Sequence, residues 1–131
     1  MYLIDTDILI SIFKGRADIQ ERVFRIGVSQ CRMSAISEAE LLVGAHKSGK
    51  QSEYNDIQTL KKIFMTIPIS DSIIDQYARL RATLEAKGMR IEDMDLFIAA
   101  TALANDCTLV THNTRHFSRI PGLKLEDWIE A

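Results

Sequence analysis

Acidic and amide side chains stand at four places where an apolar run of this sequence gives way to a loop or a new helix. These residues are Asp5, Glu40, Asp95 and Asn113. Because ligands of an open parallel α/β sheet bind outside the carboxyl ends of its strands, we expect the four side chains to converge on one crevice. Three carboxylates brought together repel one another unless a cation joins them, and hard oxygen ligands suit Mg²⁺ or Mn²⁺. The pattern therefore predicts a metal-dependent site.

Three of the acids also have an ordinary structural explanation as helix-capping residues. Asp5 or Asp7 could cap the helix that follows them by accepting backbone N–H bonds. Glu40 falls in Ser37-Glu38-Ala39-Glu40, which has the spacing of a capping box in which the glutamate reaches back to the N-cap amide. Capping and metal binding thus compete as explanations for each residue taken alone.

The remaining two positions have comparable alternatives. Asp95 lies in the first turn of a helix that Asp93 would cap, where the helix dipole favours acidic side chains. Asn113 could be a turn residue, since asparagine tolerates left-handed backbone geometry and forms Asx-turns. The repeated placement of all four residues, rather than any one of them, favours a functional site.

Length and composition indicate a single domain over residues 1–131. The chain is 47% hydrophobic, which is enough to bury a core at this size. Its 16 Lys and Arg residues against 18 Asp and Glu residues give a formal net charge of −2, so no global basic field indicates a nucleic-acid partner. Basic side chains nevertheless flank Asn113, where a local basic rim could hold phosphates.

The cysteines and the N-terminus bear on the cellular compartment. Cys31 and Cys107 are isolated, without C-x-x-C spacing, and we expect two buried free thiols. The N-terminus has no basic n-region, and no apolar run approaches the roughly 20 residues that a bilayer span needs. We expect a cytoplasmic protein with no membrane segment.

Strand-like and helix-like segments alternate along the whole chain. Strands are expected at 1–5, 31–36, 65–68 and 108–111, with a short terminal strand and helix around 123–129. Helices are expected at 7–14, 18–27, 37–48, 53–64, 71–87 and 94–105. Such alternation predicts an α/β fold whose central parallel sheet carries helices on both faces.

Several ordered motifs resemble those of PIN-domain nucleases. Residues 3–10, Leu-Ile-Asp-Thr-Asp-Ile-Leu-Ile, are similar to the opening of that family. Residues 40–45 resemble its E-L-x-x-G-A helix and residues 95–100 its D-x-x-I-A-A helix. Residues 111–117 and the tail at 120–128 are similar to the VapC toxins of type II toxin–antitoxin systems. The resemblance covers essentially the whole chain and implies a PIN-like, three-layer α/β/α fold.

The resemblance also implies an activity, a cofactor and partners. It implies a small Mg²⁺-dependent endoribonuclease that cleaves structured RNA, either tRNA or ribosomal RNA. A cognate VapB-type antitoxin would keep the enzyme silent, and the toxin would form a homodimer. The metal ligands of the family fall on Asp5, Glu40 and Asp95, and its fourth catalytic position falls on Asn113.

Three positions depart from the common family pattern. Asp7 stands where the family commonly has Asn, so that the pocket holds an extra negative charge or an extra ligand. Asn113 stands where many PIN domains have an acid, which weakens the case for a tightly held second metal. His116 stands where related toxins often carry an acid.

A metal ion held by these oxygens would activate a water molecule for in-line attack on a phosphodiester, so that no protein nucleophile is needed. Thr6 and Thr111 are candidates for orienting the water, and Asp7 and Asp93 for a supporting role or an extra ligand. The guanidinium groups of Arg115 and Arg119 are candidates for contact with RNA phosphates.

Two other functions are compatible with part of the sequence. Asp5-Thr6-Asp7 after an apolar strand fits the D-x-D nucleophile motif of haloacid-dehalogenase-like phosphohydrolases, in which the first Asp attacks phosphorus. A catalytically silent PIN fold used only for binding is the second alternative. Transfer of phosphate to Asp5 would indicate the phosphohydrolase, whereas RNA cleavage without a covalent intermediate would indicate the nuclease.

Overall fold

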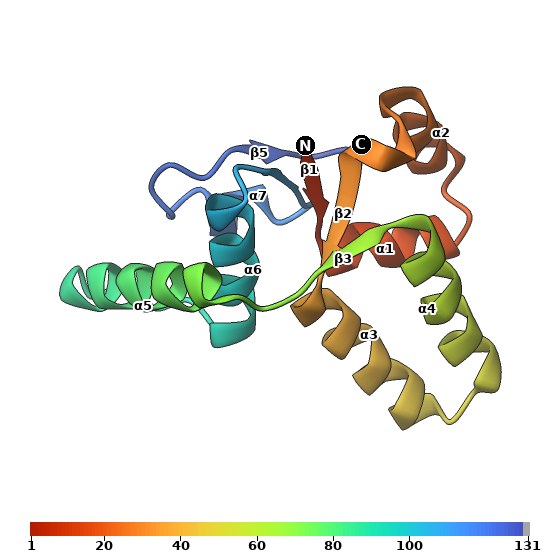
Figure 1. The fold of residues 1–131 in the computed structure, drawn as a ribbon, viewed down its shortest axis with the longest axis horizontal. Helices are drawn as coiled ribbons and strands as arrows, with labels where there is room; N and C mark the ends of the chain where they lie inside the picture. Colours follow the sequence, from red (N-terminus) through yellow and green to blue (C-terminus); the bar gives the residue numbers. More distant parts are fainter. Residues whose placement is uncertain (130–131) are drawn as a thin grey trace.

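A five-stranded parallel sheet forms the centre of the computed structural model, which describes residues 1–129 (Figure 1). Its strands are β1 (Tyr2–Ile4), β2 (Cys31–Ser34), β3 (Met65–Ile67), β4 (Thr108–Val110) and β5 (Leu125–Glu126). They lie in the order β3-β2-β1-β4-β5, and every pairing is parallel. The predicted parallel α/β architecture is confirmed.

Helices cover both faces of this sheet. They are α1 (Thr6–Phe13), α2 (Ala17–Ile26), α3 (Ala35–Ser48), α4 (Gln51–Ile63), α5 (Asp71–Ala86), α6 (Asp93–Ala104) and the short α7 (Thr114–Phe117), with a 3-10 turn η1 at Val28–Gln30. Helices α5 and α6 lie on one side of the sheet, and α1, α2 and α4 lie on the other (Figure 1).

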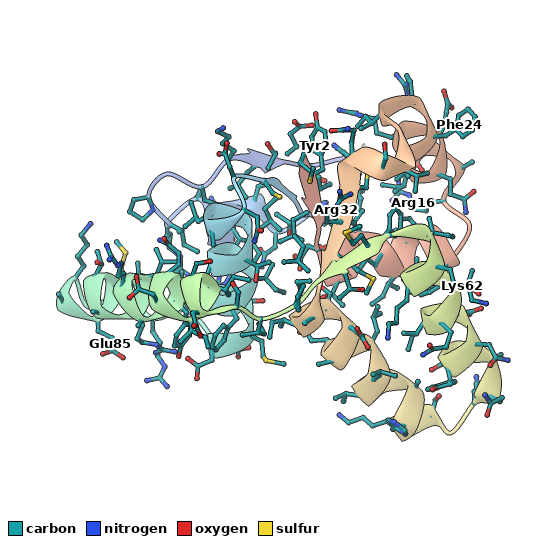
Figure 2. All side chains as sticks on the ribbon, viewed as in Figure 1. Tyr2, Arg16, Phe24, Arg32, Lys62 and Glu85 are labelled. Atoms are coloured by element: carbon teal, nitrogen blue, oxygen red, sulfur yellow. The ribbon has the colours of Figure 1, made fainter. Side chains whose placement is uncertain are left out.

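Two apolar clusters, one on each face, fill the space between these layers (Figure 2). Leu3 and Leu109 point into the cluster beneath α5 and α6, while their neighbours Ile4 and Val110 point into the cluster on the opposite face. All four side chains are fully buried, because successive residues of a strand point to opposite faces and both faces are covered. This explains why β1 and β4 read as largely apolar runs.

The order in which successive strands are added to the sheet reverses at β1. The chain passes outward from β1 to β2 and β3, and then returns to place β4 on the other side of β1. Strand β4 pairs with β1 in register, Ile4 opposite Val110. The residues that follow them, Asp5 and Thr111, therefore leave the sheet side by side at the switch point where open α/β sheets bind ligands.

The structure corrects three expectations about individual elements. Helix α3 begins at Ala35 with Ser34 as its N-cap, and not at residue 37. Helix α6 begins at Asp93 with Glu92 at the N-cap position, so Asp93 does not cap it. Residues 123–129 contain the strand β5 but no helix.

Other expectations have simpler outcomes. Cys31 and Cys107 are buried and free, as expected, and burial raises the pKa of both thiols. No helix in the described part of the chain is long and apolar enough to cross a membrane. The assignment of residues 1–131 to one domain stays a prediction, and residues 130 and 131 lie outside the part that the structure describes.

Candidate active site

Asp5 is the most deeply buried acid at the carboxyl edge of the sheet. It is the N-cap of α1, and its Oδ1 accepts a hydrogen bond from the backbone N–H of Thr6 at 2.8 Å. Its Oδ2 accepts a second bond from the Thr111 hydroxyl at 2.8 Å, across the switch point. The capping explanation is therefore correct for Asp5, and the same carboxylate is also fixed by a buried side chain from β4.

Burial raises the pKa of Asp5 to about 7, from an ordinary value of 3.8. The neighbouring carboxylates of Asp7 and Asp95 add to this rise, while the hydrogen bonds from Thr111 and Thr6 oppose it. A nearby positive charge would favour the ionised form. Asp5 thus stands in a place where a cation would relieve both desolvation and repulsion.

Thr6 connects Asp5 to Glu40. Its backbone N–H holds Asp5, and its hydroxyl donates to Glu40 Oε1 at 2.8 Å. Glu40 lies in the second turn of α3, where it is too far along the helix to serve as a capping residue, so the capping-box explanation is wrong. The cap is instead made by Ser34, whose Oγ accepts from the backbone N–H of Ser37 at 2.9 Å.

Ser37 is a residue of this site that the sequence analysis did not identify. It is buried on α3, and its Oγ lies 2.9 Å from the Thr6 hydroxyl and 3.2 Å from Ser34 Oγ. Ser37 and Glu40 are three residues apart, a spacing that places them on the same face of a helix. This spacing was the signal available in the sequence.

Asp95 lies in the first turn of α6, close enough to Asp5 to raise its pKa. Its Oδ2 is 3.1 Å from Nε2 of His116 on α7. Asp95 therefore belongs to the same edge of the sheet as Asp5 and approaches it from the opposite helical layer. The contact with His116 was not anticipated.

Asp7 also faces this edge, and the loop after β4 holds it in place. Its Oδ1 accepts from the backbone N–H of Ile8 at 2.8 Å, and its Oδ2 from the backbone N–H of His112 at 3.1 Å. The His112 ring lies 3.0 Å from Asp127. Burial raises the pKa of Asp7, and the two amide hydrogen bonds oppose that rise.

Asn113 and Asp93 are placed differently from the acids. Asn113 is exposed at the start of α7, and its side chain makes no capping hydrogen bond. Its backbone N–H donates to Thr111 Oγ at 3.0 Å, so it supports Asp5 through Thr111. Asp93 faces α5, where it accepts from the Tyr77 hydroxyl at 2.6 Å and pairs with Arg81.

Arg115 and Arg119 differ in their availability. Arg119 is exposed, but its guanidinium is already engaged, because its Nη2 lies 2.8 Å from His116 Nδ1 and its Nη1 lies 3.5 Å from the carbonyl oxygen of Arg90. Arg115 is exposed on α7, and it takes part in none of the ion pairs found among residues 1–129.

The donor set fits a hard divalent cation. Within residues 1–129, no Lys or Arg side chain pairs with Asp5, Asp7, Glu40 or Asp95. In the same part of the chain, no group of three or more His, Cys, Asp or Glu side chains is arranged to hold a metal ion directly. Mg²⁺ does not need such a group, because it keeps several waters and is usually bound by one or two carboxylates.

A groove of about 310 Å³ opens beside Thr6 and Glu40, between α1, α3 and α4. Its apolar side chains are Ile10, Phe13, Leu41 and Ile57. Its charged side chains are the acids Glu40, Glu53 and Asp56 and the base Lys14. An apolar floor with acids along it suits a ligand that carries both apolar and basic groups.

Comparisons with known proteins agree with this geometry. A family model described as the PIN domain matches residues 2–123. Ribonuclease VapC2 of Rickettsia felis is 36% identical over 134 residues, which cover 98% of each chain. The tRNA(fMet)-specific endonuclease VapC of Shigella flexneri is 30% identical over 131 residues, 97% of each chain. A chain of the solved VapBC2 complex of Rickettsia felis, bound to a DNA fragment from its promoter, aligns with a TM-score of 0.90 at 32% identity over 98% of both chains.

Proposed function

We propose a reaction for this chain, which belongs to the PIN-domain family and, within that family, to the VapC ribonuclease toxins. Its proposed reaction is the Mg²⁺- or Mn²⁺-dependent hydrolysis of phosphodiester bonds in structured RNA, with tRNA as the first substrate to test. The observation that carries the proposal is the position of Asp5. This acid is buried at the switch point, tied to Glu40 through Thr6 and close to Asp95.

Asp5, Glu40 and Asp95 are the residues that would hold the cation. When bound, it would supply water activation and neutralise charge on the leaving oxygen. The chain's own contribution is to hold the acids in place: Thr111 and the Thr6 amide fix the two oxygens of Asp5, and the Thr6 hydroxyl orients Glu40. The backbone N–H of Asn113 in turn orients Thr111.

The exposed guanidinium of Arg115 is proposed to contact an RNA phosphate near the cleavage site. Arginine suits this role because its planar donor fork matches phosphate geometry. Arg119 is less available, since its guanidinium is already bound to His116 and to the backbone.

An antitoxin is the proposed regulatory partner, and the groove beside Glu40 is its proposed docking place. A segment with apolar side chains toward Ile10 and Phe13 and a basic side chain toward Glu40 would complement the groove lining. A homodimer acting in the cytoplasm completes the proposal.

Neither alternative function is supported. The PIN-domain match covers residues 2–123, whereas the haloacid-dehalogenase resemblance rests on a single tripeptide. Asp5, the nucleophile in that alternative, is only 7% exposed, and both of its oxygens are hydrogen-bonded. A silent binding protein would have no need of the intact Asp5, Glu40 and Asp95 set.

Expression of the protein without its antitoxin tests the proposal. We expect growth arrest, together with new RNA ends that sequencing maps to a defined structured RNA. Asp5→Asn and Asp95→Asn should each abolish both effects, because each removes a ligand's charge while nearly preserving its shape. The purified enzyme should lose activity with EDTA and regain it with Mg²⁺ or Mn²⁺ but poorly with Ca²⁺, which prefers longer bonds. Undiminished cleavage by either purified variant would overturn the proposed site.

A further inference from the structure

His116 is in contact with Asp95, and its environment determines which ring nitrogen carries the proton. Its Nε2 is buried from solvent and lies 3.1 Å from Asp95 Oδ2. The approach is close but off the line of the N–H bond, and within residues 1–129 this nitrogen has no aligned hydrogen-bond partner. A buried N–H without an acceptor costs free energy, so a hydrogen bond from an Nε2–H group to Asp95 would be favourable.

Arg119 holds the other side of the same ring. Its Nη2 lies 2.8 Å from His116 Nδ1, and its Nε donates to the His116 carbonyl oxygen at 3.1 Å. A guanidinium has donors only, so Nδ1 must present a lone pair. In a neutral imidazole one nitrogen is the donor and the other the acceptor. The proton of His116 therefore sits on Nε2, facing Asp95.

We propose that His116 is a positioning residue for Asp95, with Arg119 fixing its tautomer. The Nε2–H group engages Asp95 Oδ2 and sets the orientation of the carboxylate, so that Oδ1 is turned toward the site shared with Asp5. The role in cleavage rests on the function proposed above, whereas the tautomer can be tested without any activity. On this assignment, Arg119 influences RNA cleavage through His116 and Asp95, and not by contacting a phosphate.

Nitrogen NMR of the metal-free protein tests the tautomer. Long-range proton–nitrogen correlation spectra of protein labelled with ¹⁵N-histidine, recorded at pH 8, distinguish the two neutral forms. The protein has three histidines, and the signals of His116 are identified as those that disappear in the spectrum of His116→Gln. We expect the Nε2–H form in the wild type and a mixed or reversed population in Arg119→Met. A wild-type Nδ1–H form, or a tautomer unchanged in Arg119→Met, would overturn the proposal.

Kinetics test the consequence for catalysis. Side chains that hydrogen-bond to metal ligands typically contribute about 10- to 100-fold in activity or metal affinity. We expect His116→Leu to lower kcat by such a factor and to raise the Mg²⁺ concentration needed for half-maximal activity, with KM for RNA unchanged. His116→Gln should recover most of the loss, because its amide N–H group can reach the same oxygen. His46→Leu, at an exposed position on α3, is the matched control and should behave as wild type.

The outcomes separate this inference from the proposed function. A raised KM with unchanged kcat in His116→Leu or Arg119→Met would mean that these side chains contact RNA, and the positioning role would be wrong. Equal losses in His116→Leu and His116→Gln would also reject it, because the donor would then be irrelevant. If the wild type cleaves no RNA, the proposed function fails, and the NMR result still decides the tautomer.

Discussion

Thr6 shows how one small residue can hold two acids of a site together. Its backbone amide lies at the start of α1, where it is free to donate to Asp5, and its hydroxyl reaches across to Glu40 on α3. The positions of Asp5 after β1 and of Asp95 in the first turn of α6 could be predicted from sequence, because one follows an apolar strand and the other opens an apolar helix. The connection between them could not, because it depends on the packing of α1 against α3.

The two roles considered for Glu40 can be separated by a pair of variants. Glu40→Gln keeps an oxygen that accepts the hydrogen bond from the Thr6 hydroxyl, but it offers a cation no negative charge. We expect its thermal stability in EDTA to be close to that of the wild type, while most RNA cleavage is lost. Ser34→Ala removes the true cap of α3 and should lower the free energy of unfolding by about 1 kcal/mol. Its cleavage, measured well below the melting temperature, should persist.

Chemical denaturation and a cleavage assay on the same preparations check both expectations. A Glu40→Gln variant that cleaves normally would make Glu40 a structural residue. The site would then reduce to Asp5, Asp95 and the contribution of Asp7.

At the scale of elements, the alternation of strands and helices could be predicted because period and apolar content differ between them. The beginning of α3 could not, since Ser34 and Ser37 both have a plausible capping side chain and only the structure shows which one is used. Helix α7 is only four residues long, too short to produce a periodic pattern.

The expected terminal helix illustrates how tertiary contacts override local sequence. Trp128 is buried and packs against Tyr2 of β1, with ring centroids 5.4 Å apart. Its indole N–H donates to Glu126 Oε1 at 3.0 Å. These contacts tie residues 125–128 to the edge of the sheet, where β5 pairs with β4 in an extended conformation.

Two glycines of one helix should respond oppositely to the same substitution. Gly44 lies inside α3, where an added Cβ meets no atom within 4 Å, so Gly44→Ala should stabilise the protein by about 0.5–1 kcal/mol through helix propensity. Gly49 ends α3 with φ of 68° in the left-handed region. Gly49→Ala should destabilise by a similar or larger amount, because alanine is strained in that conformation.

Urea denaturation of the two variants measures both differences directly. A loss of stability in Gly44→Ala would show that the helix interior is more crowded than the structure indicates. A neutral Gly49→Ala would show that the end of α3 can adopt another conformation without cost.

At the scale of the molecule, the uneven distribution of charge matters more than its sum. The formal net charge is only −2, yet four carboxylates gather at the carboxyl edge of the sheet and two more lie in the adjoining groove. The four are Asp5, Asp7, Glu40 and Asp95. Composition alone cannot reveal this concentration, because it depends on which acids the topology brings to one edge. An inhibitor that enters the groove from the side of α4 therefore meets three acids, Glu53, Asp56 and Glu40, against one base, Lys14.

We expect these carboxylates to attract basic side chains of the antitoxin. Glu53 and Asp56 allow that attraction to be measured without changing the proposed metal ligands. We expect the double variant Glu53→Gln/Asp56→Asn to bind the cognate antitoxin more weakly. Exposed ion pairs contribute about 0.2–1 kcal/mol each, so two lost pairs would raise Kd by up to about 30-fold. Titration calorimetry at two salt concentrations should show a smaller salt dependence for the variant than for the wild type, and cleavage without antitoxin is measured alongside.

The reciprocal change replaces every Lys and Arg in the toxin-binding segment of the antitoxin with Gln. If that antitoxin still binds and still inhibits fully, the acidic edge is not what it recognises, and apolar contacts with Ile10 and Phe13 must carry the inhibition.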